Sequence, residues 1–150
     1  MFILAENNRT PQRVEQIIEL LRTTTQPVTL IATGKSMLPT IKDGDKLTIA
    51  PYSFKERLCE NAIIVFERRH RLVCHRCLFS LGWGSRQYIY EKGDNNFLGR
   101  HISAGRIIGR LISINDNNTI PPAPMRLSPF TLLMRRITDG IYRLFKPVNR

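Results

Sequence analysis

The stretch ATGKSMLPT, residues 32–40, holds a serine that two different chemistries could use. Glycine, lysine and serine in succession can open a phosphate-binding loop. The first glycine of that pattern should stand where Thr29 does, however, and Pro39 would clash in the helix that must follow. The sequence therefore favours the alternative, that Ser36 is a nucleophile. A serine hydroxyl needs a base to take its proton, so Ser36 requires a partner elsewhere in the chain.

Three histidines could supply that base. His75 is the best candidate, because it lies in the middle of the predicted strand RLVCHRCLF, on the face opposite to Cys74 and Arg76. An imidazole with a pKa of about 6.5 can accept a proton at neutral pH. His70 lies in ERRHR, which we expect to form a turn, and His101 lies in a predicted loop. The residues alone leave open that His75 is a structural histidine.

The three cysteines, Cys59, Cys74 and Cys77, are an odd number, which fits free thiols in a reducing compartment. Cys74 and Cys77 form a C-x-x-C motif, but residues three apart in a strand point to opposite faces. They would not share a metal ion easily. We expect no metal site and no other cofactor.

The first element that must position these residues is a helix in an N-terminal segment, residues 1–27. Thr10 is a suitable N-cap and Pro11 suits the first helical position. Apolar residues then follow helical spacing, which predicts one amphipathic helix over residues 11–23. Residues 1–9 are expected to fray. The apolar positions are Val14, Ile17, Ile18 and Leu21.

A β domain is predicted over residues 28–114. Six segments there are rich in strand-forming residues and are separated by turn signals such as Asp43-Gly44-Asp45 and Gly93-Asp94-Asn95-Asn96. The fold class is therefore mainly β, with about six strands in a closed or half-closed barrel. The segments are VTLIAT, KLTIAP, NAIIVFER, RLVCHRCLF, QYIYEKG and RIIGRLISI.

Two segments are expected after the barrel. Residues 115–124, NDNNTIPPAP, form a polar, proline-rich connector with no reason to be regular. Residues 125–150 place apolar and basic side chains on different sides of a helical wheel, which predicts a basic amphipathic helix. This helix could pack on the barrel, or it could lie on an anionic membrane surface.

The charge of the chain points to an anionic partner. The net charge is +11 and the isoelectric point is about 10.3, which suits lipid head groups or nucleic acid. Nucleic acid is not the expected partner, because the aromatic residues are not interleaved with basic ones as single-strand binding needs. The apolar runs are too short to span a bilayer, and the first residues do not resemble a signal peptide. We expect a cytoplasmic protein that could lie at the inner membrane face.

Several strings, taken in order, resemble one family. They are GKSMLPTIKDGDKLTIAP, ENAIIVFERRHRLVCHRCL, YIYEKGDNN and IIGRLISI, and they cover most of residues 28–114. This order of motifs is similar to that of the S24/S26 serine proteases, which include the signal peptidases. The resemblance implies an all-β protease fold in which the serine of S-M-x-P attacks a peptide carbonyl.

The resemblance also implies roles for individual residues. Ser36 corresponds to the nucleophile, and His75 in its H-R pair resembles the base of the endoplasmic-reticulum, archaeal and sporulation-type signal peptidases. The backbone N–H of Ser36 would donate to the oxyanion. Gly34 would leave room for a substrate backbone, while Met37 and Leu38 would form an apolar lip beside the scissile bond.

The third member of a catalytic triad is not evident from the sequence. The histidine-type enzymes carry an aspartate soon after the K-G-D-N-N turn, where this chain has Gly99 and Arg100. Asp94 could orient His75 instead, or it could simply build its own turn.

Three functions follow from these observations. The leading one is a serine endopeptidase with a Ser36/His75 dyad that cleaves an extended leader or precursor peptide after small residues. A second is a self-cleaving S24-type regulator, cut between Ala104 and Gly105, although in that branch the cut precedes the nucleophile in the chain. A third is an inactive module that binds peptide or nucleic acid on the same fold.

Overall fold

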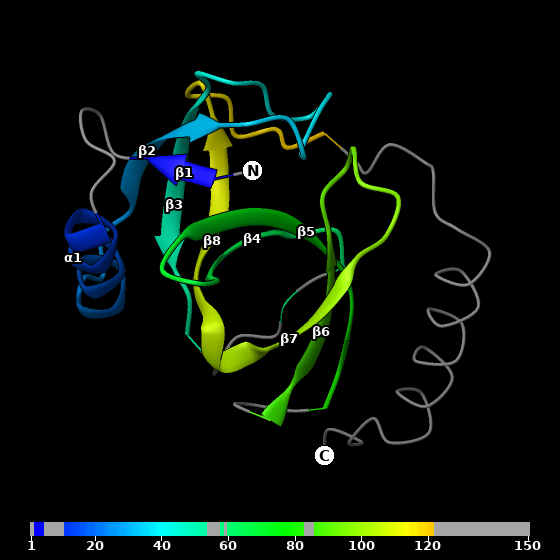
Figure 1. Ribbon diagram of the computed structural model, residues 1–150. Helices are drawn as coiled ribbons and strands as arrows, with labels where there is room; N and C mark the ends of the chain where they lie inside the picture. Colours follow the sequence, from blue (N-terminus) through cyan, green and yellow to red (C-terminus); the bar gives the residue numbers. More distant parts are fainter. Residues whose placement is uncertain (1, 5–10, 54–57, 59, 83–85, 122–150) are drawn as a thin grey trace, which may run out of the picture.

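The computed structural model describes residues 2–4, 11–53, 58, 60–82 and 86–121 (Figure 1). The described chain is mainly β, as predicted, with one α-helix, α1 (Pro11–Thr23). The predicted C-terminal helix, residues 125–150, lies outside the described residues. The strands are β1 (Phe2–Leu4), β2 (Val28–Thr33), β3 (Lys46–Pro51), β4 (Ile63–Glu67), β5 (Leu72–Leu81), β6 (Tyr88–Lys92), β7 (Arg100–Ser103) and β8 (Ile107–Ile114).

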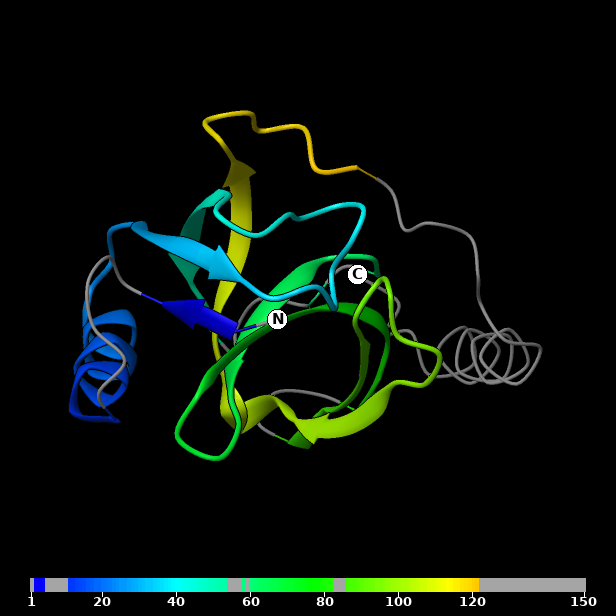
Figure 2. The same cartoon turned by 45° about the horizontal axis from the view of Figure 1, so that its top comes forward.

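The eight strands form one antiparallel sheet in the order β1-β2-β3-β8-β4-β5-β6-β7. The sheet curls into a half-barrel, so that β1 also pairs with β5 through Phe2 and Val73 (Figure 2). This curl brings the end of β2 close to the first half of β5. The turn after β2 carries Ser36 and β5 carries His75, so the curl is what can bring the two together.

Helix α1 has the predicted bounds and buries the predicted face. Ile18 and Leu21 are buried, and Val14 and Ile17 pack against the same core. Helices that bury one apolar stripe in this way gain most of their stability from that contact. Within the described residues, no helix is long and apolar enough to cross a membrane.

The six predicted strand segments correspond to β2, β3, β4, β5, β6 and β8, and the bounds of β2 and β3 are those predicted. Two strands were missed. β1 lies where fraying was expected, and β7 includes His101, which was expected in a loop. Both are short, and in β7 only Ile102 is buried, so neither has enough alternation to stand out in the sequence.

Strands β4 and β5 are buried on both faces, because each separates two hydrophobic clusters. Cys74 belongs to one cluster and Cys77 to the other, which confirms that the C-x-x-C residues point to opposite faces. Burial raises the pKa of the Cys74 thiol to about 12, so this thiol stays protonated. The first cluster includes Leu21, Met37, Leu47, Val65 and Leu111, and the second includes Ile64, Phe66, Val73, Ile89 and Ile107.

A tight turn joins β4 to β5, as ERRHR predicted. Arg68 and Arg71 exchange backbone hydrogen bonds, and the two residues between them have positive φ angles, 50° for Arg69 and 57° for His70. Two-residue loops of this kind match the twist of the strands that they join. The turn therefore holds three arginines close together at one end of β5.

The segment 115–124 is more regular at its start than predicted. Asn115 and Asp116 have positive φ angles, and Asn117 bridges back to Ile114. The side-chain carbonyl of Asn115 accepts a hydrogen bond from the backbone N–H of Lys46 at 2.8 Å. The asparagine side chain thus fixes this turn against the start of β3, an interaction that asparagine favours in turns.

Candidate active site

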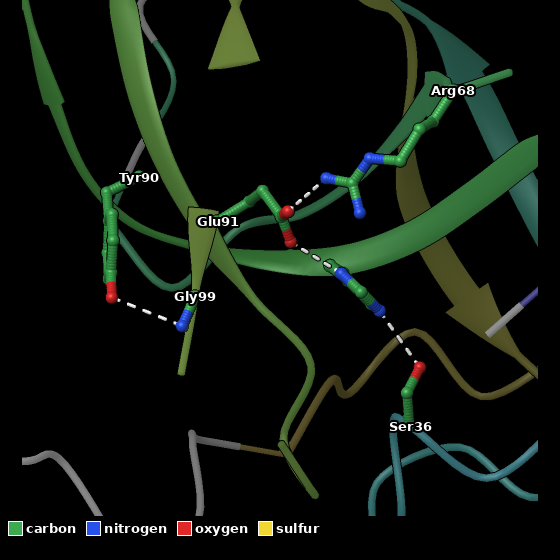
Figure 3. Close-up of polar contacts among 6 residues, drawn as sticks. Ser36, Arg68, Tyr90, Glu91 and Gly99 are labelled. Carbon is green, nitrogen blue, oxygen red and sulfur yellow. Dashed lines mark hydrogen bonds and ion pairs between the residues drawn. The ribbon is translucent and has the colours of Figure 1, made fainter. Parts of the chain in front are cut away.

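Ser36 and His75 lie in contact and line one cleft. The Ser36 Oγ lies 2.9 Å from Nε2 of His75, within hydrogen-bond distance (Figure 3). Ser36 comes from the turn after β2, and His75 comes from the middle of β5. The structure therefore brings together the two residues that the sequence paired, although they are 39 positions apart.

Glu91 completes a chain of hydrogen bonds behind them. Its Oε2 lies 2.5 Å from Nδ1 of His75, so the histidine donates its Nδ1 proton to Glu91 and accepts from Ser36 through Nε2. Glu91 lies on β6 and is 1% exposed. Its other carboxylate oxygen contacts Arg68, whose guanidinium also lies over the Phe66 ring, 5.0 Å from the centroid. The carboxylate is thus held in one orientation.

The ionisation of Glu91 depends on these partners. Burial alone would raise its pKa, but the hydrogen bond from His75, the charge of that ring when it is protonated, and the hydrogen bond and charge of Arg68 outweigh burial and lower the pKa below the ordinary value of 4.5. Glu91 is therefore a carboxylate at neutral pH. Because its folded-state pKa is depressed, its contribution to stability is present at neutral pH and is lost as the pH falls through that lowered value.

Asp94 does not take the orienting role considered for it. Its carboxylate accepts hydrogen bonds from Arg76 at 2.7 and 2.8 Å and from the Thr40 hydroxyl at 2.5 Å. Both ring nitrogens of His75 already have other partners. The Arg76–Asp94 ion pair is buried, so Asp94 neutralises a buried guanidinium and joins the turn after β6 to the turn that carries Ser36.

Sequence reasoning missed Glu91, although a signal for it was present. In the alternating segment QYIYEKG, Glu91 shares a face with Ile89, which lies in the second hydrophobic cluster. An acidic residue on the buried face of a strand needs a partner. His75 lies on the same side of the neighbouring strand, close to Phe66, at 6.1 Å between ring centroids.

Gly34 and Asp43 shape the turn that carries Ser36. Gly34 has a φ of 99°, which disfavours any residue with a side chain, and its backbone N–H donates to Asp43 Oδ1 at 2.8 Å. Gly34 also lines the cleft in front of Ser36, where it leaves space open. Both observations fit the predicted role of Gly34.

Met37 is not the apolar lip that was predicted. Its side chain is fully buried in the first hydrophobic cluster, while Leu38 is half-buried. The Met37 side chain thus enters the core, while the Ser36 hydroxyl contacts His75. Met37 therefore anchors the Ser36 turn in the core.

The turn after β6 supports Ser36 from the other side. The backbone N–H of Asn95 donates to the carbonyl of Ser36 at 2.8 Å, and its side-chain amide donates to the carbonyl of Lys35 at 3.2 Å. Gly93 packs so closely that a Cβ there would lie 2.5 Å from the Ser36 carbonyl oxygen. The Gly-Asp-Asn-Asn segment thus positions the serine by backbone contacts.

Gly99 also lies against this network. Its N–H donates to the Tyr90 hydroxyl at 3.1 Å (Figure 3), and a Cβ at this position would overlap the carbonyl of Glu91. No side chain could therefore approach His75 from position 99 without moving β6.

The other two histidines take no part in the pair. His70 lies in the β4–β5 turn and faces Glu15, at 3.7 Å. His101 is exposed on β7 and packs against Tyr90, at 4.9 Å between ring centroids.

A cleft of about 610 Å³ opens onto Ser36 and His75. This volume is in the range of clefts that hold small ligands or short peptide segments. Its lining comes from the turn after β2, the β4–β5 turn, β5 and the start of β7. The lining residues are Gly34, Lys35, Ser36, Arg68, Arg69, Arg71, Val73, His75, Asn96 and Arg100.

The sequence matches no protein-family model and no curated protein. The geometry of Ser36, His75 and Glu91 and of the cleft in front of them is therefore the basis for a functional proposal.

Proposed function

We propose that this chain is a serine endopeptidase of the S24/S26 type, which cleaves an extended leader or precursor peptide after small residues. The observation that supports it best is the unbroken chain of hydrogen bonds from Ser36 through His75 to Glu91, which opens into a cleft. A nucleophile, a base and a group that orients the base are the three parts of a catalytic triad, whatever the fold.

In the proposed reaction, His75 Nε2 takes the Ser36 proton as the oxygen attacks a peptide carbonyl carbon. The tetrahedral intermediate collapses, the C–N bond breaks, and His75 returns the proton to the leaving amine. Water then adds to the acyl-enzyme by the same route and releases the acid. Glu91 keeps the Nδ1 proton in place and stabilises the imidazolium in each half of the reaction.

The backbone N–H of Ser36 is the proposed donor to the oxyanion, as the family resemblance implies. Gly34 leaves the space beside it open to the substrate backbone.

Glu91 is also a candidate to replace the aspartate that the family pattern has and this chain lacks. The aspartate of the histidine-type enzymes is replaced here by Gly99 and Arg100, and a side chain at position 99 would overlap the Glu91 carbonyl. Glutamate has a longer side chain than aspartate, and from β6 the Glu91 carboxylate can hold Nδ1 of His75 in place of that aspartate. Glu91 is thus the proposed third residue of the triad.

Covalent labelling tests this proposal. We expect a fluorophosphonate probe to modify Ser36, as mapped by peptide mass spectrometry, and we expect labelling to be lost in His75→Ala, because the serine then has no base. His101→Ala is the matched control, since it removes an exposed histidine outside the pair. Absence of labelling in the folded parent protein would refute the proposal and favour a peptide-binding module.

Self-cleavage between Ala104 and Gly105 is disfavoured by the structure. Ala104 is fully buried in the second hydrophobic cluster, and its N–H donates to the carbonyl of Gln87 at 3.0 Å. A scissile bond must lie extended in the cleft, so this segment would first have to leave the core.

A further inference from the structure

Among the described residues, the cleft in front of Ser36 is lined by several basic side chains and by no acidic one. The basic residues are Lys35, Arg68, Arg69, Arg71 and Arg100. Basic surface residues are usually solvated and scattered. Here they come from three separate segments of the chain and face one concavity, where their fields add.

Arg68 has a carboxylate partner inside the protein. Arg68 is bound to Glu91 and packs on Phe66. Lys35, Arg69 and Arg100 are exposed, and none forms an ion pair with any carboxylate in the part of the chain that the structure describes. Two basic residues outside the cleft, Arg22 and Lys46, do have carboxylate partners.

The cations lie at a defined distance from the catalytic pair. Val73 and His75 share one face of β5, and Arg71 lies two residues before Val73, where the β4–β5 turn meets the strand; all three line the cleft. At about 3.3 Å per residue, Arg71 lies roughly 13 Å along the strand from His75. A substrate in extended conformation also spans about 3.3 Å per residue. Arg71 and the nearby Arg69 would therefore face a substrate residue about three to four positions from the cut bond.

We propose that this cleft selects peptide segments that carry aspartate or glutamate about three to four residues from the scissile bond. The inference rests on the proposed peptidase function, and it adds the class of substrate. Arginine forks bind carboxylates well, and pairing with the substrate supplies Lys35, Arg69 and Arg100 with a carboxylate partner that the described residues do not give them. Nucleic acid fits less well, because no Phe, Tyr or Trp among the described residues lines the cleft as a platform on which a base could stack.

Peptide binding to the full-length Ser36→Ala variant tests this without requiring catalysis. Two fluorescent ten-residue peptides are compared by anisotropy, one with Asp and Glu at the stated distance from an Ala-Ser bond and one with Asn and Gln there. We expect the acidic peptide to bind on the order of tenfold more tightly at low salt, as several partly exposed ion pairs would give. The difference should shrink strongly in 1 M NaCl, where screening is short-ranged.

Two double variants, both made in Ser36→Ala, distinguish the effect of the basic cleft residues on peptide preference from the effect of the net charge. Arg69→Asn with Arg100→Gln should abolish most of the preference, and asparagine suits the positive φ at position 69. Lys42→Gln with Arg106→Gln removes the same charge from exposed residues outside the cleft and should retain the preference. Circular dichroism and thermal unfolding establish that all variants are folded.

Three results would overturn the inference: equal binding of the two peptides, equal loss in both double variants, or displacement of the acidic peptide by a lower concentration of a short oligonucleotide. Ser36 labelling reports separately on the peptidase proposal. Labelling without an acidic preference would remove this inference alone. An acidic preference without labelling would remove the peptidase function and leave a site for acidic peptides.

Discussion

At the scale of single residues, the site contains one carboxylate, that of Glu91, in addition to the Ser/His dyad that the sequence predicted. Glu91, on β6, and Asp94, in the turn after β6, both have buried side chains, yet they have different partners. Glu91 holds the histidine, and Asp94 holds Arg76 and Thr40. The two acids can therefore be separated by mutation, one as the partner of His75 and one as the partner of Arg76.

Conversion of each acid to its amide should separate these roles. We expect Glu91→Gln to reduce the rate of Ser36 labelling by about 10³- to 10⁴-fold, because the amide cannot keep the Nδ1 proton in place. Asp94→Asn should instead lower the thermal unfolding midpoint, because it leaves the buried Arg76 without its counter-charge. Labelling rates are measured below the unfolding midpoint of each variant. Equal loss of labelling in both would contradict the assignment of Glu91.

Both residues of the pair were predicted from the sequence, and the third residue was not. Ser36 and His75 lie in local contexts, a Gly-rich turn and a β strand, that sequence patterns describe well. Glu91 reaches His75 only through the register of β5 with β6, which shifts between Cys77 and Phe79. The sequence instead suggested Asp94 as the residue that orients His75, because Asp94 lies in the recognisable turn motif Gly93-Asp94-Asn95-Asn96. A β-bulge leaves no local sequence signature that would have corrected this choice.

At the scale of elements, two turns from distant parts of the chain hold Ser36 between them. Met37 fixes one side of the serine turn in the hydrophobic core, and the Gly93–Asn96 turn bonds to its carbonyl groups from the other side. Neither contact could be read from the sequence, which predicted that Met37 forms an apolar lip beside the scissile bond.

Gly93 lies so close to the backbone of the Ser36 turn that a side chain at position 93 would disturb the contact between the two turns. Gly93→Ala would place a Cβ 2.5 Å from the Ser36 carbonyl oxygen, so the two turns must separate. We expect slower labelling of Ser36 by at least tenfold, since small displacements of catalytic groups are costly. Gly105→Ala is the control, because its Cβ would meet only the Ser103 hydroxyl, at 3.8 Å. Unchanged labelling in Gly93→Ala would show that this turn does not position the serine.

At the scale of the whole molecule, two parts of the chain could use the charge of +11. One is the basic cleft, which lies within the described residues. The other is the segment 125–150, for which the sequence predicts a basic amphipathic helix outside them. A helix of this type can lie on an anionic membrane surface, where apolar burial and charge act together.

Vesicle co-sedimentation distinguishes these two uses of charge. We expect the full chain to pellet with phosphatidylserine-containing vesicles and not with neutral phosphatidylcholine vesicles. A full-length variant with Arg135, Arg136 and Arg143 changed to Gln should pellet much less, as should a chain that ends at Pro124, because each basic residue near such a surface contributes about 1 kcal/mol. The cleft variant, Arg69→Asn with Arg100→Gln, should pellet like the parent protein. If the chain that ends at Pro124 pellets as well as the full chain, the membrane contact is not made by this segment, and its predicted apolar stripe is better explained by packing on the half-barrel.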